Sequence, residues 1–275
     1  MHEANEDIPQ LPESLESDPL AHKLLRWLTT QGYPLEMRIA RAFLDLGRVT
    51  QSGYYHDSEA DCYREIDVQV GMRSDMEKDP WLEVTLCIEA KSSTEKPWVL
   101  FCMDHDSPLH PIAAVVQRFC SAPMREWLER QARFKEVRKL PLFDIELSPG
   151  YSLVRASLGQ SQGEDVAYKA VLSSVKACHW ATTRTDTEPH ANKFLIMAIP
   201  VIVIDAPLFK CTLNEQGKLQ LSRTNIGTLI WHDNRLVPTA PPNIIVSVVT
   251  EAGLPEFVER VRSSVEPLIA RYEEN

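Results

Sequence analysis

The sequence lacks the short motifs that mark the common metal and nucleotide sites of proteins. It contains no C-x-x-C pair, no H-E-x-x-H, no EF-hand loop and neither of the glycine-rich phosphate loops, G-x-x-x-x-G-K-[ST] and G-x-G-x-x-G. The spacing of the six cysteines therefore argues against a structural zinc site. The missing glycine loops remove support for the nucleotide-binding folds that use them. A Cys–His nucleophile pair stays open, although nothing local to any cysteine supports it.

A long hydrophobic run is also missing. The longest, Phe194 to Ile204, is too short to cross a membrane and is interrupted by Pro200. Residues 1–18 are acidic, contain proline and have neither a basic nor an apolar region, so we expect a flexible leader rather than a signal peptide. Without a secretion signal, we expect the cysteines to be reduced and the protein to be cytoplasmic, with no membrane partner.

Positive charge is in deficit, with 29 Lys and Arg against 39 Asp and Glu and a net charge of −10. This balance argues against a protein that coats DNA without specificity, because phosphate contacts dominate that kind of affinity. It does not exclude a nuclease, since acidic metal ligands contribute to the count and a local basic patch can coexist with an acidic remainder. The 275 residues, 44% hydrophobic and 25% charged, match a soluble globular chain of one large or two small domains.

Hydrophobic periodicity predicts an α/β protein. We expect a single domain over 19–275, with 140–165 as the place of a break if there are two parts. The predicted helices are 18–30, 34–46, 164–179 and 255–273, with a helical pattern over 111–139 and irregular chain over 140–153. The predicted strands are 49–55, 62–70, 82–91, 98–102, a buried strand at 201–204 within the apolar run 193–213, two within 219–238 around a turn at 232–234, and 244–249.

Three polar residues stand out on two of these strands. Strand side chains alternate between two faces. In 62–70, Asp67 lies on the face opposite Ile66 and Val68. In 82–91, Glu89 and Lys91 share the polar face. A lysine beside a carboxylate at the end of an apolar strand suits the binding of a divalent cation and the activation of a water.

These residues and the order of the elements resemble the PD-(D/E)XK nuclease superfamily, whose common core runs helix, three strands, helix, strand. The matching segments would be 34–46, 49–55, 62–70, 82–91, 164–179 and 199–209, about half of the chain. The resemblance implies a restriction-endonuclease-like core, a mixed central sheet flanked by helices, with an insertion at 98–160 and a C-terminal strand–helix extension. The proline that leads the family motif is absent, because Ile66 precedes Asp67.

The resemblance also implies roles for individual residues. Asp67, Glu89 and the backbone carbonyl of Ala90 would bind Mg²⁺ or Mn²⁺, which prefer oxygen ligands. Lys91 would position the attacking water and stabilise charge that develops on the phosphate. Glu36, which matches the family's helix carboxylate, would bind the metal directly or through water. Lys169 would contact phosphate.

Ordinary structural roles remain open for the same residues. Glu36 falls in a first helical turn, where a carboxylate offsets the helix dipole. Asp67 could cap a turn, and Glu89 with Lys91 could belong to a solvated strand face. Five arginines near these residues in the sequence are candidate phosphate contacts or surface partners of acidic residues: Arg38, Arg41, Arg48, Arg64 and Arg73.

The leading hypothesis is a metal-dependent endonuclease that hydrolyses DNA with a metal-activated water, a chemistry used in restriction, repair and phage defence. One alternative is a catalytically inactive protein of the same fold that serves as an interaction or assembly module. Another is a hydrolase directed at RNA or nucleotides. A homodimer or a protein partner is compatible with each.

Overall fold

A mixed β-sheet forms the centre of the protein. The computed structural model describes residues 11–75, 77, 80–92, 96–103, 110–158, 165–184, 194–232 and 241–274, and within them the sheet has 11 strands. The strands are β1 (Arg48–Asp57), β2 (Cys62–Arg73), β3 (Trp81–Lys91), β4 (Trp98–Cys102), β5 (Phe119–Cys120), β6 (Gly150–Arg155), β7 (Phe194–Ile204), β8 (Leu208–Leu213), β9 (Leu219–Thr224), β10 (Ile226–Trp231) and β11 (Ile244–Thr250).

Seven α-helices are present in the described residues. They are α1 (Pro19–Leu28), α2 (Tyr33–Ala42), α3 (Pro111–Val116), α4 (Ala122–Gln131), α5 (Lys135–Arg138), α6 (Val166–Thr183) and α7 (Leu254–Glu273), with 3-10 turns η1 (Glu13–Leu15) and η4 (Glu251–Gly253). None of the described helices is long and apolar enough to cross a membrane.

The sheet order is β1-β2-β3-β7-β11-β10-β6-β4-β8-β9, and β5 adds to β7. β1, β2 and β3 pair antiparallel, and β3 then pairs parallel with β7 over its whole length. Every residue of β3 from Leu82 to Ala90 is buried, because helices cover both faces of the sheet at this strand. The polar residues of β3 therefore face helices rather than bulk water.

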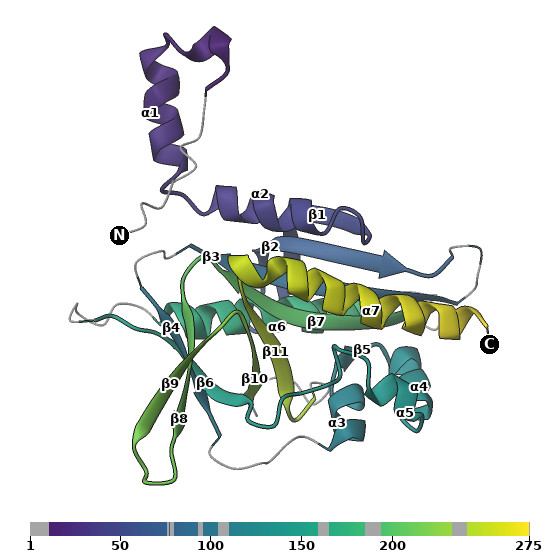
Figure 1. Ribbon diagram of the computed structural model, residues 1–275. Coiled ribbons are helices and arrows are strands. Elements are labelled where there is room, and N and C mark those ends of the chain that lie inside the picture. Colours follow the sequence, from purple (N-terminus) through teal and green to yellow (C-terminus); the bar gives the residue numbers. More distant parts are fainter. Residues whose placement is uncertain are drawn as a thin grey trace.

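Two hydrophobic cores lie on opposite faces of the sheet. The first joins α2, α4 and α7 to one face, and the second packs α6 against the other. Figure 1 shows α2 and α7 running along one side of the strands with α6 behind them. The protein is thus an α/β protein in which a large mixed sheet packs against helices and ends with a strand and a long helix.

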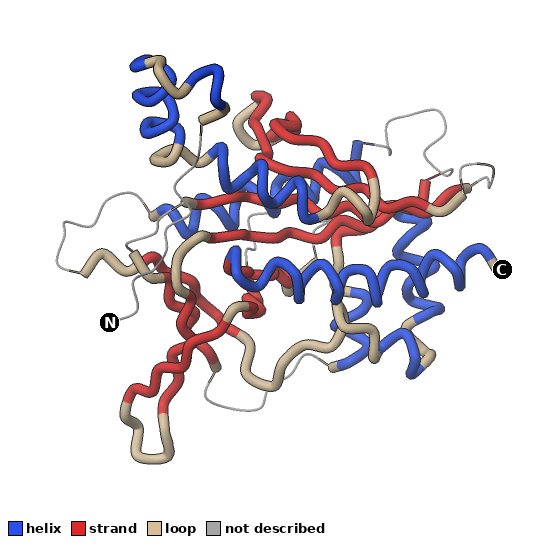
Figure 2. The backbone as a smooth tube through the Cα atoms, turned by 45° about the horizontal axis from the view of Figure 1, so that its top comes forward, coloured by secondary structure: helices blue, strands red, loops and turns tan. Residues whose placement is uncertain are grey.

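Helix α1 stands apart from both cores. It contains no buried residue, and Leu20, Leu24 and Trp27 are 71%, 51% and 52% exposed. Both views show it projecting from the body of the protein (Figures 1 and 2). Its amphipathic pattern correctly predicted a helix but not a place in the core.

Several predicted boundaries were wrong. The strand expected at 199–209 begins at Phe194 and ends at Ile204, where a turn leads to β8. The helical pattern over 111–139 divides into α3, α4 and α5, because the intervening Phe119–Cys120 pairs with β7 instead. The region 140–153, expected to be irregular, contains the start of β6.

Three further expectations concern the N-terminal segment, a turn and an insertion. Of the leader 1–18, residues 1–10 lie outside the described residues, while η1 and the cap of α1 by Asp18 order part of the remainder. The break within 219–238 falls at Asn225, whose backbone and side-chain oxygens accept from Thr250. Residues 233 and 234 of the expected turn are outside the described residues. The expected insertion 98–160 supplies β4 and β6 to the main sheet.

Candidate active site

The candidate site lies where β2 and β3 part. Their antiparallel pairing ends at Val68 and Ile88, so Asp67 and Glu89 follow the last pair. The Ala90 N–H donates to the Asp67 carboxylate at 2.7 Å instead of to a strand carbonyl. Because the N–H and C=O of one strand residue point to the same side, the Ala90 carbonyl faces this opening too. Opposite Asp67, Ser52 adopts a φ of 51°, a strained conformation of the kind that gathers at functional sites.

Lys91 lies between the two carboxylates. Its Nζ is 2.5 Å from Glu89 Oε1 and 3.9 Å from Asp67 Oδ2. The second oxygen of Glu89 accepts from the Ser173 hydroxyl of α6 at 2.8 Å. The three sequence-predicted residues Asp67, Glu89 and Lys91 are therefore brought together, with one positive charge shared by two negative ones.

Burial and mutual repulsion perturb these carboxylates. Burial raises the pKa of Glu89, and the neighbouring Asp67 raises it further, while Lys91 opposes both effects. Burial likewise raises the pKa of Asp67 above its usual value, against the attraction of Lys91 and the hydrogen bond from Ala90. A site whose carboxylates resist ionisation in this way gains most from a bound cation.

Glu36 approaches the same cluster from α2. Burial raises its pKa to about 7, with repulsion from Asp67 as the next cause. A Cβ placed at Gly32 would lie 3.5 Å from Glu36 Oε1, so this carboxylate folds back towards the residue before α2. It is close enough to feel the site and is also placed to offset the dipole of its helix.

Glu89 and Lys91 line a groove between β1, β2, β3 and α6, and Asp67 lies outside its lining. The groove has a volume of about 770 Å³. Its polar lining includes four cations and three carboxylates: Arg64, Lys91, Lys169, Lys176, Asp57, Glu65 and Glu89. The local balance is positive in a chain whose net charge is −10. Such a groove suits a phosphate-bearing ligand.

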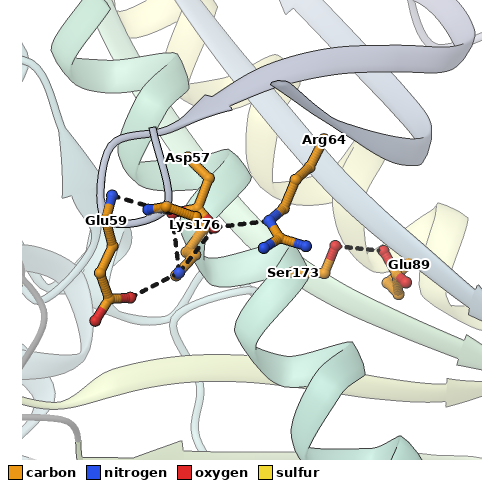
Figure 3. A network of polar contacts seen from close by, with 7 residues as sticks. Asp57, Glu59, Arg64, Glu89, Ser173 and Lys176 are labelled. Carbon is orange, nitrogen blue, oxygen red and sulfur yellow. Dashed lines mark hydrogen bonds and ion pairs between the residues drawn. The ribbon is translucent and has the colours of Figure 1, made fainter. Parts of the chain in front are cut away.

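A partly buried ion-pair network forms one wall of the groove (Figure 3). The Lys176 ammonium lies 2.9 Å from Asp57 and 2.7 Å from Glu59, and the Arg64 guanidinium donates to Asp57 at 2.7 Å. Asp57 is 2% exposed. Although burial alone would raise its pKa, the hydrogen bonds from Lys176, the Ala60 N–H and Arg64 hold that pKa below its usual value. The network fixes the β1–β2 hairpin to α6.

The other residues that the sequence predicted as phosphate contacts lie in different parts of the structure. Lys169 and Arg64 line the groove. Arg38 does not; its guanidinium pairs with Glu251 before α7, and it lines a separate hollow with Arg41, between α1 and α2.

Sequence reasoning did not find Ser173, Lys176 or Asp57. The first two were detectable in principle, because Lys169, Ser173 and Lys176 follow one another at spacings of four and three residues, which places them on one helix face. Tyr55, which lines the same groove and whose pKa is raised by burial, gave no comparable signal.

The residues present fit a Mg²⁺ site in which the protein supplies only a few of the ligands. Within the part of the chain that the structure describes, no group of three His, Cys, Asp or Glu side chains is arranged to hold a metal by itself. Mg²⁺ does not need such a cage, since it keeps several waters and is held by one or two carboxylates together with substrate phosphates. Asp67 and Glu89, with the Ala90 carbonyl beside them, supply that kind of donor set.

Comparison of the chain with protein families, with curated proteins and with solved structures found no match.

Proposed function

We propose that the protein is a divalent-metal-dependent nuclease of the PD-(D/E)XK type that hydrolyses phosphodiester bonds of DNA. One observation carries the proposal: Lys91 Nζ lies between Glu89 and Asp67 at the point where β2 and β3 part, facing a cationic groove. The element order α2-β1-β2-β3-α6-β7 agrees with the core that this superfamily is expected to have.

Asp67, Glu89 and the Ala90 carbonyl would hold Mg²⁺ or Mn²⁺. A cation bound there would polarise the scissile phosphate and acidify a water. The ammonium of Lys91, now neutralising Glu89, would be released towards the phosphate and stabilise the charge that develops on it. Arg64, Lys169 and Lys176 would hold the flanking phosphates in the groove. Glu36 would add a carboxylate at the rim of the site.

The direct test is cleavage of plasmid and linear DNA in Mg²⁺, Mn²⁺ or EDTA. The variant to compare is Asp67→Asn, because an amide oxygen can still accept from the Ala90 N–H while the charge is lost. We expect metal-dependent nicking by the parent and a loss of about 10²-fold or more in the variant. Undiminished cleavage by Asp67→Asn would contradict the assignment of Asp67, and absence of cleavage by a folded parent would contradict the proposed function.

Ser173→Ala is expected to weaken metal binding without removing a ligand. The Ser173 hydroxyl orients Glu89 through its 2.8 Å hydrogen bond, and loss of such an orienting contact costs about 10- to 100-fold in metal affinity or activity. Calorimetric titration with Mn²⁺ measures the effect. Ser263→Ala is the matched control, since the Ser263 hydroxyl also donates to a carboxylate, that of Glu259 at 2.9 Å, but on the solvent-exposed face of α7. Equal Mn²⁺ affinities of the two variants would refute the positioning role.

The exposed apolar face of α1 favours a second candidate, an interaction module of the same fold without catalysis. Within the described part of the chain, Leu20, Leu24 and Trp27 are exposed rather than packed in a core. An exposed apolar face of this kind marks a surface for binding a protein partner. The two candidates differ in metal dependence. Binding of Mn²⁺ to the folded state must raise the melting temperature of a nuclease, whereas the interaction module predicts no such shift.

A further inference from the structure

A second hollow, separate from the groove of Lys91, lies on the same face of the sheet. It has a volume of about 260 Å³ and is bounded by β1, β2, β3 and the end of α6. We call it the arginine pocket, after Arg48, Arg73 and Arg184 in its lining. Glu83 is the sole acidic residue among the described residues that line it. Three positive charges against one make the pocket strongly cationic in a chain of net charge −10.

Two of the three arginines are oriented by contacts with neighbouring side chains. Arg73 donates through Nε to Glu83 at 2.8 Å and lies over the Trp81 ring at 4.7 Å. Arg184 lies 4.8 Å from the centre of the Trp180 ring. Arg48 has no ion-pair partner among the described residues. A planar guanidinium that is already oriented loses less freedom when it binds phosphate through two parallel hydrogen bonds.

The floor of the pocket is strand backbone and small side chains. Gly53 and Gly71 line it beside Thr50, Gln69 and Thr85. A Cβ at Gly71 would come within 2.9 Å of Glu83 Oε1, and one at Gly53 within 3.1 Å of Gln69 Oε1. The glycines thus leave space at the floor, and the hydroxyl and amide groups add neutral hydrogen-bonding capacity. This lining suits a single phosphate with its sugar rather than an apolar ligand.

Helix α6 connects the two sites. Ser173 and Lys176 face the groove, and Trp180 and Arg184 line the arginine pocket. Arg184 is the eleventh residue after Ser173, which is about 16 Å along a helix. A DNA strand advances by about 3.4 Å per nucleotide, so the arginine pocket lies about five nucleotides from the groove.

We propose that the arginine pocket binds a backbone phosphate of the nucleic acid whose scissile bond lies at Lys91, and so sets the direction in which the substrate crosses the sheet. The inference rests on the proposed nuclease function. It assigns Arg48, Arg73 and Arg184 to substrate binding at a distance from the reacting atoms.

The test is the salt dependence of binding to a 20-base-pair duplex in EDTA, measured by fluorescence anisotropy. The variant is Arg48→Ala with Arg184→Ala, which leaves the Arg73–Glu83 pair intact. Arg130→Ala with Arg133→Ala is the control, since it removes the same charge from exposed positions on and just after α4, in the other layer. Loss of the one phosphate contact made in the pocket lowers the slope of log K against log salt by about 0.9. The parent's affinity should then fall about 3.5-fold more than the variant's between 50 and 200 mM salt.

Hydrolysis of a small chromogenic phosphodiester with Mn²⁺, measured in parallel, separates this inference from the proposed function. We expect parent, variant and control to hydrolyse it equally, since the ester reaches only the catalytic groove. If the salt slope of the variant equals that of the parent and the control, the arginine pocket does not bind phosphate. That result would not affect the proposed nuclease function. Loss of ester hydrolysis in the variant would also overturn it. A folded parent that neither binds the duplex nor hydrolyses the ester would refute both proposals.

Discussion

Lys91→Ala is expected to abolish metal-dependent DNA cleavage, with a rate loss of at least about 10²- to 10³-fold. The variant loses the ammonium that would stabilise charge on the phosphate. It should nevertheless bind Mn²⁺ at least as tightly as the parent, because Glu89 and Asp67 no longer share a positive charge 2.5 and 3.9 Å away. Cleavage assays and calorimetric titration with Mn²⁺ measure the two effects separately.

Lys218→Ala provides the matched control for this variant. Lys218 is exposed between β8 and β9, and its removal changes the net charge by the same amount. We expect it to leave cleavage and Mn²⁺ binding unchanged. If Lys91→Ala cleaves DNA as the parent does, or if it loses Mn²⁺ affinity along with activity, the role assigned to Lys91 is wrong.

Asp57→Asn is expected to cause a large loss of stability, about 3 kcal/mol in the free energy of unfolding. The change leaves the Lys176 ammonium, whose side chain is 12% exposed, without one of its two carboxylates. It also weakens the hydrogen bond from Arg64. Urea denaturation measures the loss. Asp61→Asn, on the same hairpin but 94% exposed, should change stability by no more than about 0.5 kcal/mol.

The same pair of variants predicts a dependence on pH. The pKa of Asp57 is lowered from 3.8 in the folded protein, so the unfolded chain takes up the proton first as pH falls. The stability that Asp57 contributes is therefore fully present above about pH 4 and is lost as pH falls through its lowered folded pKa. The difference in urea midpoint between parent and Asp57→Asn should shrink below pH 4. A difference that stays constant from pH 6 to pH 3 would show that the charge of Asp57 is not its cause.

Hydrophobic periodicity predicted the bounds of a helix or strand well wherever that element has one apolar and one polar face. The strand around Asp67 and the helix at the C-terminus were predicted close to their observed bounds, β2 and α7. Prediction was weaker where tertiary pairing overrode local preference. The pattern over 111–139 is helical, yet Phe119–Cys120 pairs with β7 and Arg118 donates to the carbonyls of Ala114 and Leu142 from a buried position.

The sequence alone placed Glu89 and Lys91 side by side, because alternation along one strand is a local property that no distant contact can change. It also indicated Asp67 as a residue of unusual character for a strand interior. The distance between these residues was not determined locally. It follows from the antiparallel register that ends at Val68 and Ile88, leaving the Ala90 N–H to Asp67.

Only the tertiary structure joined the remaining groups to the site. Ser173 meets Glu89 across 84 residues of sequence, and Lys176 meets Asp57 across 119. These contacts depend on how α6 docks on the sheet through its buried alanine and valine face, and such docking is decided by packing over the whole core. The sequence thus determined which side chains share a strand face, and the packing of α6 decided which polar groups surround them.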